Sequence, residues 1–232
     1  MRILVTGANG YLGQGIVRHL LDLGVEVIAA DFSVDYVDER AERIACSLFD
    51  VEDPYTYFKQ PDVLLHLAWR DGFVHYSDAH LDDLPKHYHF ISRMAESDIA
   101  TIAVMGSMHE IGFYEGCIKE NTPCHPTTPY GISKNALREL SDMLCKKHSK
   151  NFIGFVAIIL LATVSVEIQF SQRSLPLRQM GRRNSRLQRD RISLILLTMK
   201  ILLSRLPEQH VRIKSLVLST FVPDIRKNLQ TE

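Results

Sequence analysis

The feature that most constrains this chain is a glycine-rich turn near its first residue. The residues "RILVTG" form a short, β-rich apolar run, as expected of a buried parallel strand. In the segment that follows, "GANGYLGQGIVRHLLDLG", Gly7, Gly10 and Gly13 have the spacing G-x-x-G-x-x-G. Apolar residues then recur with helical periodicity up to Gly24, and "VEVIAAD" forms a second apolar run that ends on Asp31. This order is typical of a dinucleotide-binding βαβ unit.

The same unit predicts how a dinucleotide would bind. Glycines allow the backbone to approach a pyrophosphate at the amino terminus of the helix, and the acid at the end of the second strand takes the adenosine ribose hydroxyls. No Arg or Lys directly follows Asp31. This favours NAD over NADP, because the 2′-phosphate of NADP would meet a carboxylate.

Further apolar runs continue the βαβ rhythm. The segment "ERIACSLFD" predicts a third strand running into Asp50, "DVLLHLAW" a fourth, and "IATIAVMGS" a fifth that ends at Ser107. Between the last two, residues 83–97 predict a helix. The fold class is therefore α/β, a doubly wound parallel sheet of the Rossmann type.

The carboxyl ends of these strands are where chemistry is expected. Ser107 lies there, and "TTPYGISKNALRELSDMLCKKH" places Tyr130 and Lys134 four residues apart, on one face of a helix. A nearby ammonium would favour the phenolate and lower the pKa of the tyrosine. Tyr130 would then exchange a proton with a substrate hydroxyl that Ser107 also holds, while NAD takes or gives the hydride.

The first 150 residues resemble the extended short-chain dehydrogenase/reductases, specifically the NAD-dependent epimerase/dehydratase family that acts mainly on nucleotide sugars. The resemblance rests on "TGANGYLG", "FDVED", "LLHLAW", "MGSMHEIG" and "YGISK". It implies a catalytic set of Ser107, Tyr130 and Lys134. It also implies NAD contacts from Gly7, Gly10, Tyr11, Leu12, Gly13, Asp31, Asp50, Val51, Leu67, Ala68, Tyr130 and Lys134, with Asp50 and Val51 at the adenine.

Five histidines and a Trp-Arg-Asp segment also lie near these strands. His66, His75, His80, His87 and His89 lack the spacing of a metal site, and the resemblance implies no metal. We expect these histidines on loop and helix surfaces. Trp69, Arg70 and Asp71, just after the fourth strand, are better candidates for substrate contact.

Composition divides the chain sharply. Residues 1–150 carry 14 Lys and Arg against 22 Asp and Glu, whereas residues 151–232 carry 13 against 5. The four cysteines are scattered, which suits a reducing cytosol and predicts a cytoplasmic protein. The opening run before the glycine turn reads as a strand and not as a signal peptide.

The last eighty residues fit none of three ordinary explanations. The apolar run at residues 152–166 is shorter than the roughly 20 residues of a membrane span. The basic tract at 173–191 has no aromatic residue for stacking on nucleic-acid bases. Residues 171–191 show no clear helical or strand period, so no membrane, nucleic acid or native domain is predicted.

A fourth explanation is a lost reading frame near codon 152. Read one frame away, permitted codons can encode "LRGYYIVG" where the resemblance requires a sixth strand. We therefore predict an NAD-binding domain at 1–152 and an out-of-frame tail at 153–232, with no sixth strand or substrate domain and weak or absent catalysis. The intact parent would bind a nucleotide sugar and form a homodimer. The alternative is a non-catalytic NAD-binding or regulatory module with a basic interaction tail.

Overall fold

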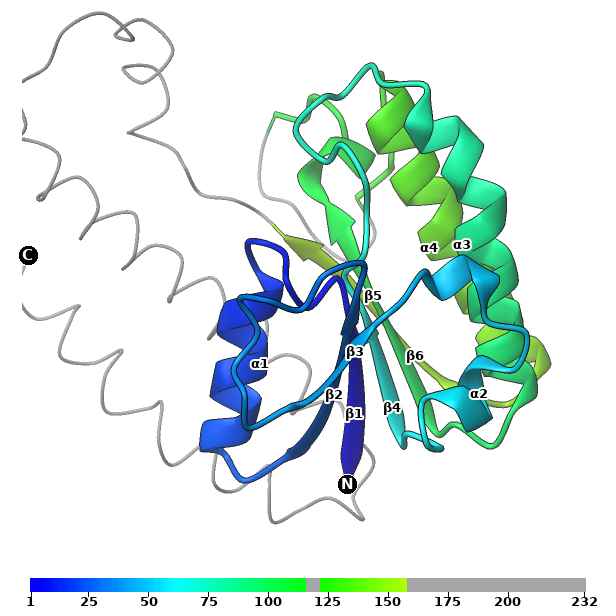
Figure 1. The fold of residues 1–232 in the computed structure, drawn as a ribbon. Coiled ribbons are helices and arrows are strands. Elements are labelled where there is room, and N and C mark those ends of the chain that lie inside the picture. Colours follow the sequence, from blue (N-terminus) through cyan, green and yellow to red (C-terminus); the bar gives the residue numbers. More distant parts are fainter. Residues whose placement is uncertain (116–121, 158–232) are drawn as a thin grey trace, which may run out of the picture.

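The computed structural model describes residues 1–115 and 122–157, which form one sheet with helices on both faces (Figure 1). The six strands are all parallel, in the order β3-β2-β1-β4-β5-β6. This is the strand order of the doubly wound dinucleotide-binding fold. The strands are β1 (Arg2–Thr6), β2 (Glu26–Asp31), β3 (Glu42–Ala45), β4 (Val63–His66), β5 (Thr101–Ser107) and β6 (Asn151–Ala157).

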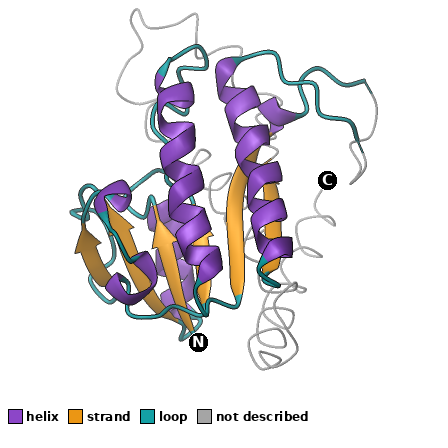
Figure 2. Ribbon diagram, turned by 90° about the vertical axis from the view of Figure 1, so that its right-hand side faces the viewer, coloured by secondary structure: helices purple, strands orange, loops and turns teal. Residues whose placement is uncertain are grey.

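Helices cover the two faces unequally. Helix α1 (Gly13–Asp22) packs on one face, and α3 (Ala79–Glu96) and α4 (Pro129–Lys147) lie side by side on the other (Figures 1 and 2). The short helix α2 (Pro54–Tyr57) and the 3-10 turns η1 (Leu48–Asp50) and η2 (Met108–Glu110) lie in connections that follow strands. The apolar runs of the central strands are buried on both sides, as expected of a parallel sheet between helices.

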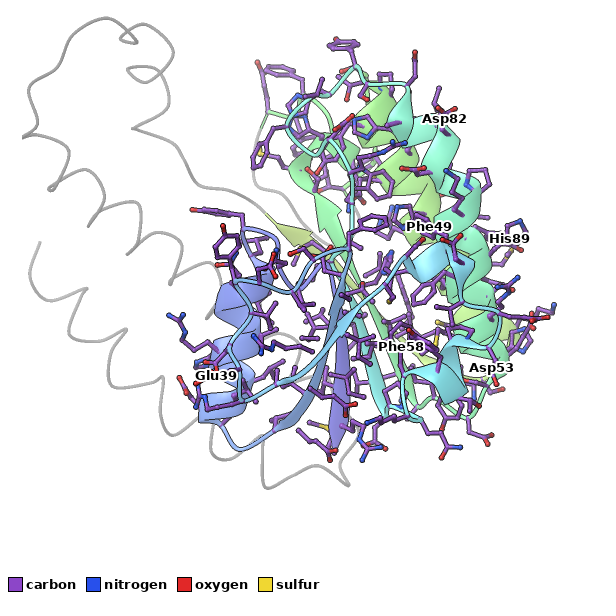
Figure 3. All side chains as sticks on the ribbon, in the orientation of Figure 1. Glu39, Phe49, Asp53, Phe58, Asp82 and His89 are labelled. Carbon is purple, nitrogen blue, oxygen red and sulfur yellow. The ribbon has the colours of Figure 1, made fainter. Side chains whose placement is uncertain are left out.

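Two apolar cores result, one on each face of the sheet. The first packs Ile16, Val17 and Leu20 of α1 against β1 and β2. The second packs α3 and α4 against the other face, and it includes Phe58 and the half-buried Phe49 (Figure 3). The sheet thus holds its carboxyl ends, from Thr6 to Ser107, along one edge of a rigid scaffold.

The doubly wound parallel sheet is confirmed, but two element boundaries were predicted incorrectly. The third strand ends at Ala45 and does not run into Asp50, because the buried Leu48 begins the turn η1 and packs into the core beside α3. Helix α3 begins at Ala79, four residues earlier than predicted, and continues through Pro85.

The expected absence of a sixth strand is also wrong. Strand β6 pairs in parallel with the whole of β5, from Thr101 opposite Asn151 to Ser107 opposite Ala157. Ladder hydrogen bonds join main-chain atoms, so the open edge of β5 accepts an extended apolar segment whatever its family pattern. The predicted domain boundary at 152 falls within this strand, and residues 158–232 of the predicted tail lie outside the described residues.

In the part of the chain that the structure describes, none of the helices combines the length and the apolar character that a bilayer crossing requires.

Candidate functional site

The glycine turn between β1 and α1 is closely packed against neighbouring backbone. Gly7 has a φ of +69°, and a Cβ there would lie 2.6 Å from the backbone nitrogen of Ala68. A Cβ on Gly13 would lie 2.3 Å from the carbonyl oxygen of Gly7. Gly10 is different, because it is exposed and a Cβ there would meet only that carbonyl oxygen, at 3.1 Å. Two glycines are therefore required by the fold, whereas the third keeps the outer face of the turn open.

Asp31, at the end of β2, is held toward this turn. Its carboxylate accepts hydrogen bonds from the backbone N–H of Asn9, at 2.9 Å, and from that of Phe32, at 2.8 Å. The amino terminus of α1 has no acid in its first turn, so its partial positive charge is not offset locally. Tyr11 is exposed beside it and Leu12 packs into the first core.

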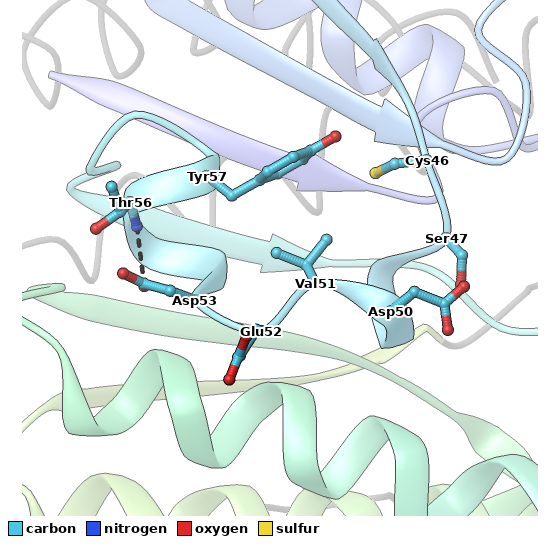
Figure 4. Close-up of a pocket in the computed structure, with 8 residues that line it drawn as sticks. All are labelled: Cys46, Ser47, Asp50, Val51, Glu52, Asp53, Thr56 and Tyr57. Carbon is cyan, nitrogen blue, oxygen red and sulfur yellow. Dashed lines mark hydrogen bonds between the residues drawn. The ribbon is translucent and has the colours of Figure 1, made fainter.

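The predicted adenine residues lie on a separate stretch after β3. Asp50 is exposed and Val51 is half-buried, and both line a pocket of about 550 Å³ (Figure 4). Its other lining residues are Cys46, Ser47, Glu52, Asp53, Thr56 and Tyr57. Neither Ser107 nor Tyr130 lines this pocket, so it does not contain the predicted chemistry.

At the carboxyl end of β5, Ser107 lies close enough to Tyr130 for its side chain to lower the pKa of the phenol by hydrogen bonding. Tyr130 lies in the first turn of helix α4, directly after Pro129. Thr128 caps the helix, because its side chain accepts a hydrogen bond from the backbone N–H of Gly131. Burial raises the pKa of Tyr130, the hydrogen bond from Ser107 lowers it, and the nearby Glu110 raises it.

Lys134 lies one helical turn further along α4 and is buried. Its Nζ donates to the carbonyl oxygen of Met105 at 2.8 Å and lies 4.2 Å from the ring centre of Trp69. Burial lowers the pKa of Lys134 to about 8, while Glu110 acts in the opposite direction. The expected lowering of the Tyr130 pKa by this ammonium is therefore not observed, because the ammonium is directed at Met105 and Trp69 and burial of the phenol dominates.

An ion pair that the sequence analysis missed supports Ser107. The fully buried carboxylate of Glu110 accepts a hydrogen bond from the backbone N–H of Ser107, at 2.6 Å, and another from Arg138 Nε, at 3.0 Å. The Ser-x-x-Glu spacing is a capping-box signature that could have indicated the first contact. Arg138 lies four residues after Lys134, so one face of α4 carries both cations.

The histidines are placed differently from the prediction. Three of the five histidines are buried, namely His66, His80 and His87, and His75 is half-buried. His89, on α3, is the exposed one of the five (Figure 3). The prediction of surface positions is wrong for the three buried histidines, because β4 and the inner face of α3 carry them. Within the described residues, no three His, Cys, Asp or Glu side chains are grouped so as to hold a metal ion.

Rings also gather around Tyr130. His75 stacks on it at 5.3 Å between ring centres, and His80 and His109 lie at 5.1 Å and 5.5 Å. The backbone N–H of Tyr130 donates to the carbonyl oxygen of His75 at 3.1 Å, which fixes the loop after β4 against the start of α4. Arg70, in the same loop, pairs with Asp83 of α3 at 2.9 Å.

The residues present fit a dinucleotide. A side chain at Gly7 or Gly13 would fill the space between the turn and its neighbours, Asp31 is fixed at the end of β2, and Leu67 and Ala68 lie against the turn. Backbone N–H groups at the start of α1 can bind a pyrophosphate. The arrangement places the glycine turn and Asp31, at β1 and β2, along the same edge of the sheet as Ser107 and Tyr130, at β5 and α4.

Among curated proteins, the chain is 43% identical over 144 residues to dTDP-6-deoxy-L-talose 4-dehydrogenase (NAD(+)) of Aggregatibacter actinomycetemcomitans, which covers 60% of this chain and 53% of that protein. It is 25% identical over 182 residues to the uncharacterized UDP-glucose epimerase YtcB of Bacillus subtilis (strain 168), covering 69% of this chain and 55% of that protein. The chain spans about half the length of the curated relatives it matches.

Solved structures support the fold. A UDP-glucose 4-epimerase superposes with a TM-score of 0.61 at 21% identity, covering 67% of this chain and 51% of that one. The Thermus thermophilus UDP-glucose 4-epimerase in complex with NAD gives 0.59 at 23% identity, covering 66% and 54%. Residues 3–172 match the family model described as NAD dependent epimerase/dehydratase. With the glycine cradle, the strand order and this match together, the chain belongs to the NAD dependent epimerase/dehydratase family.

Proposed function

We propose that this chain carries the cofactor-binding and proton-handling part of an NAD-dependent nucleotide-sugar 4-dehydrogenase, with a dTDP-linked 6-deoxyhexose as the substrate class. The observation that carries the proposal is the placement of Ser107 near Tyr130 at the carboxyl end of β5, with the buried Lys134 one turn away. The substrate class follows the 43% identity to a dTDP-6-deoxy-L-talose 4-dehydrogenase.

In this proposal, Gly7, Gly10 and Gly13 hold the pyrophosphate of NAD and Asp31 holds its adenosine ribose. The bound cofactor supplies hydride transfer with the sugar carbon. In the direction of oxidation, Tyr130 as phenolate would accept the hydroxyl proton of one sugar carbinol. Bound NAD would accept the hydride from the same carbon, so that the C–H and O–H bonds break and a carbonyl forms. In the direction of reduction, Tyr130 returns the proton to the carbonyl oxygen.

Ser107 and Lys134 have distinct parts in this step. The Ser107 hydroxyl orients the substrate oxygen beside the phenol. Burial keeps the phenol of Tyr130 protonated near neutral pH, which suits its role as an acid during reduction. For oxidation, the hydrogen bond from Ser107 favours the phenolate. Lys134, which is directed at Met105 and Trp69, holds the start of α4 against β5.

The test is to mix the purified full chain with NAD and dTDP-6-deoxy-L-talose and follow nicotinamide absorbance. We expect Tyr130→Phe to lower any turnover about 100-fold or more while NAD binding persists. Lys146→Met, an exposed change on the same helix, is the matched control. Turnover that survives in Tyr130→Phe contradicts the assignment of the acid. NAD binding without turnover, both in this chain and in a protein with the reading frame restored near codon 152, favours the alternative, a non-catalytic NAD-binding module.

We also propose that residues from about 153 onward are translated out of frame from the parent gene, and that the intact parent is a cytoplasmic homodimer. The change from acidic to basic composition at residue 150 supports the frame proposal. Sequencing the coding DNA tests it. A single-base change near codon 152 should yield a protein with nucleotide-sugar turnover and a dimeric sedimentation coefficient, and failure to open such a frame rejects the proposal.

A further inference from the structure

The ammonium of Lys134 is buried with few polar neighbours. Only 4% of the residue is exposed, and Nζ donates to the carbonyl oxygen of Met105 at 2.8 Å. A lysine ammonium has three donors, and burying its charge without compensation is costly. The indole of Trp69, with its ring centre 4.2 Å from Nζ, presents the negative face of its π system to the charge. This is the geometry of a cation–π contact.

Trp69 is itself fixed on its remaining sides. Its Nε1–H donates to His80 Nδ1 at 3.1 Å, and its ring stacks on His87 at 4.8 Å with an interplanar angle of 12°. An indole nitrogen only donates, so His80 Nδ1 must accept, and the proton on Nε2 of His80 is donated to the carbonyl oxygen of Val74 at 2.9 Å. The indole orientation is therefore determined by hydrogen bonding and stacking together.

The support behind Trp69 reaches the glycine turn. His87 Nδ1 lies 2.9 Å from His66 Nε2, and His66 Nδ1 lies 2.8 Å from Thr6 Oγ1, the residue directly before Gly7. A continuous set of ring and hydrogen-bond contacts thus joins the end of β1 to the indole and then to the ammonium. Movement of the indole would be opposed by contacts on β1, β4 and α3.

We propose that Trp69 is a positioning residue for Lys134: the face of its indole fixes the ammonium against the Met105 carbonyl, near the carboxyl end of β5. This inference rests on the proposed function, in which Lys134 belongs to the same catalytic set as Ser107 and Tyr130. It replaces the expectation that Trp69 contacts the substrate, because the ring is occupied by Lys134 and His87. Trp69 lies after β4 and Lys134 on α4, so the contact also couples these two elements.

The groups facing the pair come from every element around it. They are His66 of β4, His80 and His87 of α3, Glu110 of η2 and Tyr130 of α4. Burial lowers the pKa of both His66 and His87, so these two rings are neutral near neutral pH. Burial raises the pKa of Tyr130, so the phenol titrates above Lys134.

The sequence contains a single tryptophan, so indole fluorescence of the full chain reports on Trp69 alone. An ammonium over the ring shifts the emission, because the excited-state dipole responds to the charge. We expect the wild-type emission to change with a midpoint near the Lys134 pKa of about 8. We expect Lys134→Met to abolish the transition and the exposed Lys146→Met to leave it unchanged. A transition that persists in Lys134→Met, or none in the wild type, overturns the proposal.

A second measurement tests the ring itself. The Lys134 pKa can be followed by NMR in protein with 13C-labelled lysine, in the wild type, Trp69→Phe and Trp69→Leu. Loss of the aromatic face should lower the pKa by about 0.4 to 1.5 units in Trp69→Leu, and less in Trp69→Phe, which keeps a ring. Equal midpoints in all three proteins contradict the proposal. Neither readout requires turnover, so failure of the proposed function leaves this test intact.

Discussion

The buried carboxylate of Glu110 lies between Ser107 and Arg138, accepting from the backbone of the first and from the guanidinium of the second, at 2.6 and 3.0 Å. This single side chain joins the end of β5 to the middle of α4. It therefore determines how Ser107 faces Tyr130, which lies on the same helix two turns before Arg138. The ion pair is therefore a structural support of the predicted catalytic set.

Removing one member of this pair should destabilise the chain more than removing both. Arg138→Met leaves a buried, unpaired carboxylate and should lower the free energy of unfolding by about 3–5 kcal/mol. The double variant Glu110→Met/Arg138→Met leaves no buried charge and should cost less. Urea unfolding of the full chain measures all three proteins. A double variant less stable than Arg138→Met would contradict this account.

The same variant has a defined pH dependence. Burial raises the folded pKa of Glu110 above its ordinary value of 4.5. The contribution of this group to the free energy of unfolding is therefore fully present below pH 4.5 and is lost as pH rises through the folded pKa. Loss of the Arg138 charge should raise that pKa further. The stability gap between wild type and Arg138→Met should therefore narrow as the pH is lowered toward 4.5.

The elements that local pattern determines were predictable. The spacing of Gly7, Gly10 and Gly13 predicts the strand, turn and helix because Gly7 and Gly13 leave no room for a Cβ against the neighbouring backbone. Placing a strand end before a helix start predicted that Ser107 and Tyr130 lie at the same edge of the sheet, and hydrogen bonding with Ser107 lowers the pKa of Tyr130. Their catalytic roles stay predictions.

The contacts that tertiary packing determines were not predictable. His66 and His87 are 21 residues apart, and nothing in the spacing shows that β4 and α3 bring their rings together in the core. The direction of Lys134 depends on an indole from another element. Strand β6 was missed because its ladder is made by backbone atoms, which carry no side-chain signature.

The histidine pair predicts sensitivity to acid. Burial lowers the pKa of His66 well below 6.5 and that of His87 to about 3. A base with a lowered folded pKa contributes stability above its unfolded value, which is lost as pH falls toward the folded one. Each histidine should then remove up to about 1.4 kcal/mol per pH unit below about 6.5. Unfolding by urea at a series of pH values measures the slope.

A non-titrating replacement isolates one histidine. His87→Gln offers an amide in place of the ring nitrogen that faces His66, so the acid slope should become shallower by about one proton. His89→Gln changes an exposed residue on the same helix and should retain the wild-type slope. Equal slopes in wild type and His87→Gln would show that the buried pair does not govern acid stability.

Alanine substitutions at Gly13 and Gly10 should distinguish the effect of the turn on folding from its effect on NAD binding. Gly13→Ala places a Cβ 2.3 Å from a backbone oxygen and should destabilise the fold and abolish NAD binding. Gly10→Ala meets that oxygen at 3.1 Å, so we expect a small loss of stability and a weaker affinity for NAD. Calorimetric titration with NAD and urea unfolding measure the two effects. An unchanged NAD affinity in Gly10→Ala would argue against the turn as the pyrophosphate site.

The buried ammonium of Lys134 should lower the free energy of unfolding near neutral pH. Its folded pKa of about 8 lies below the ordinary 10.5, so its contribution to stability is present above 10.5 and lost as pH falls through about 8. At neutral pH the buried charge should cost up to about 3 kcal/mol, partly offset by Met105 and Trp69. Lys134→Met should therefore be more stable than the wild type near pH 7, by about 1–2 kcal/mol.

The difference should shrink as pH rises from about 8 to 10.5, whereas the exposed Lys146→Met should change little across that range. A Lys134→Met protein that is less stable at pH 7, or a difference independent of pH, would refute the assignment of a destabilising buried ammonium.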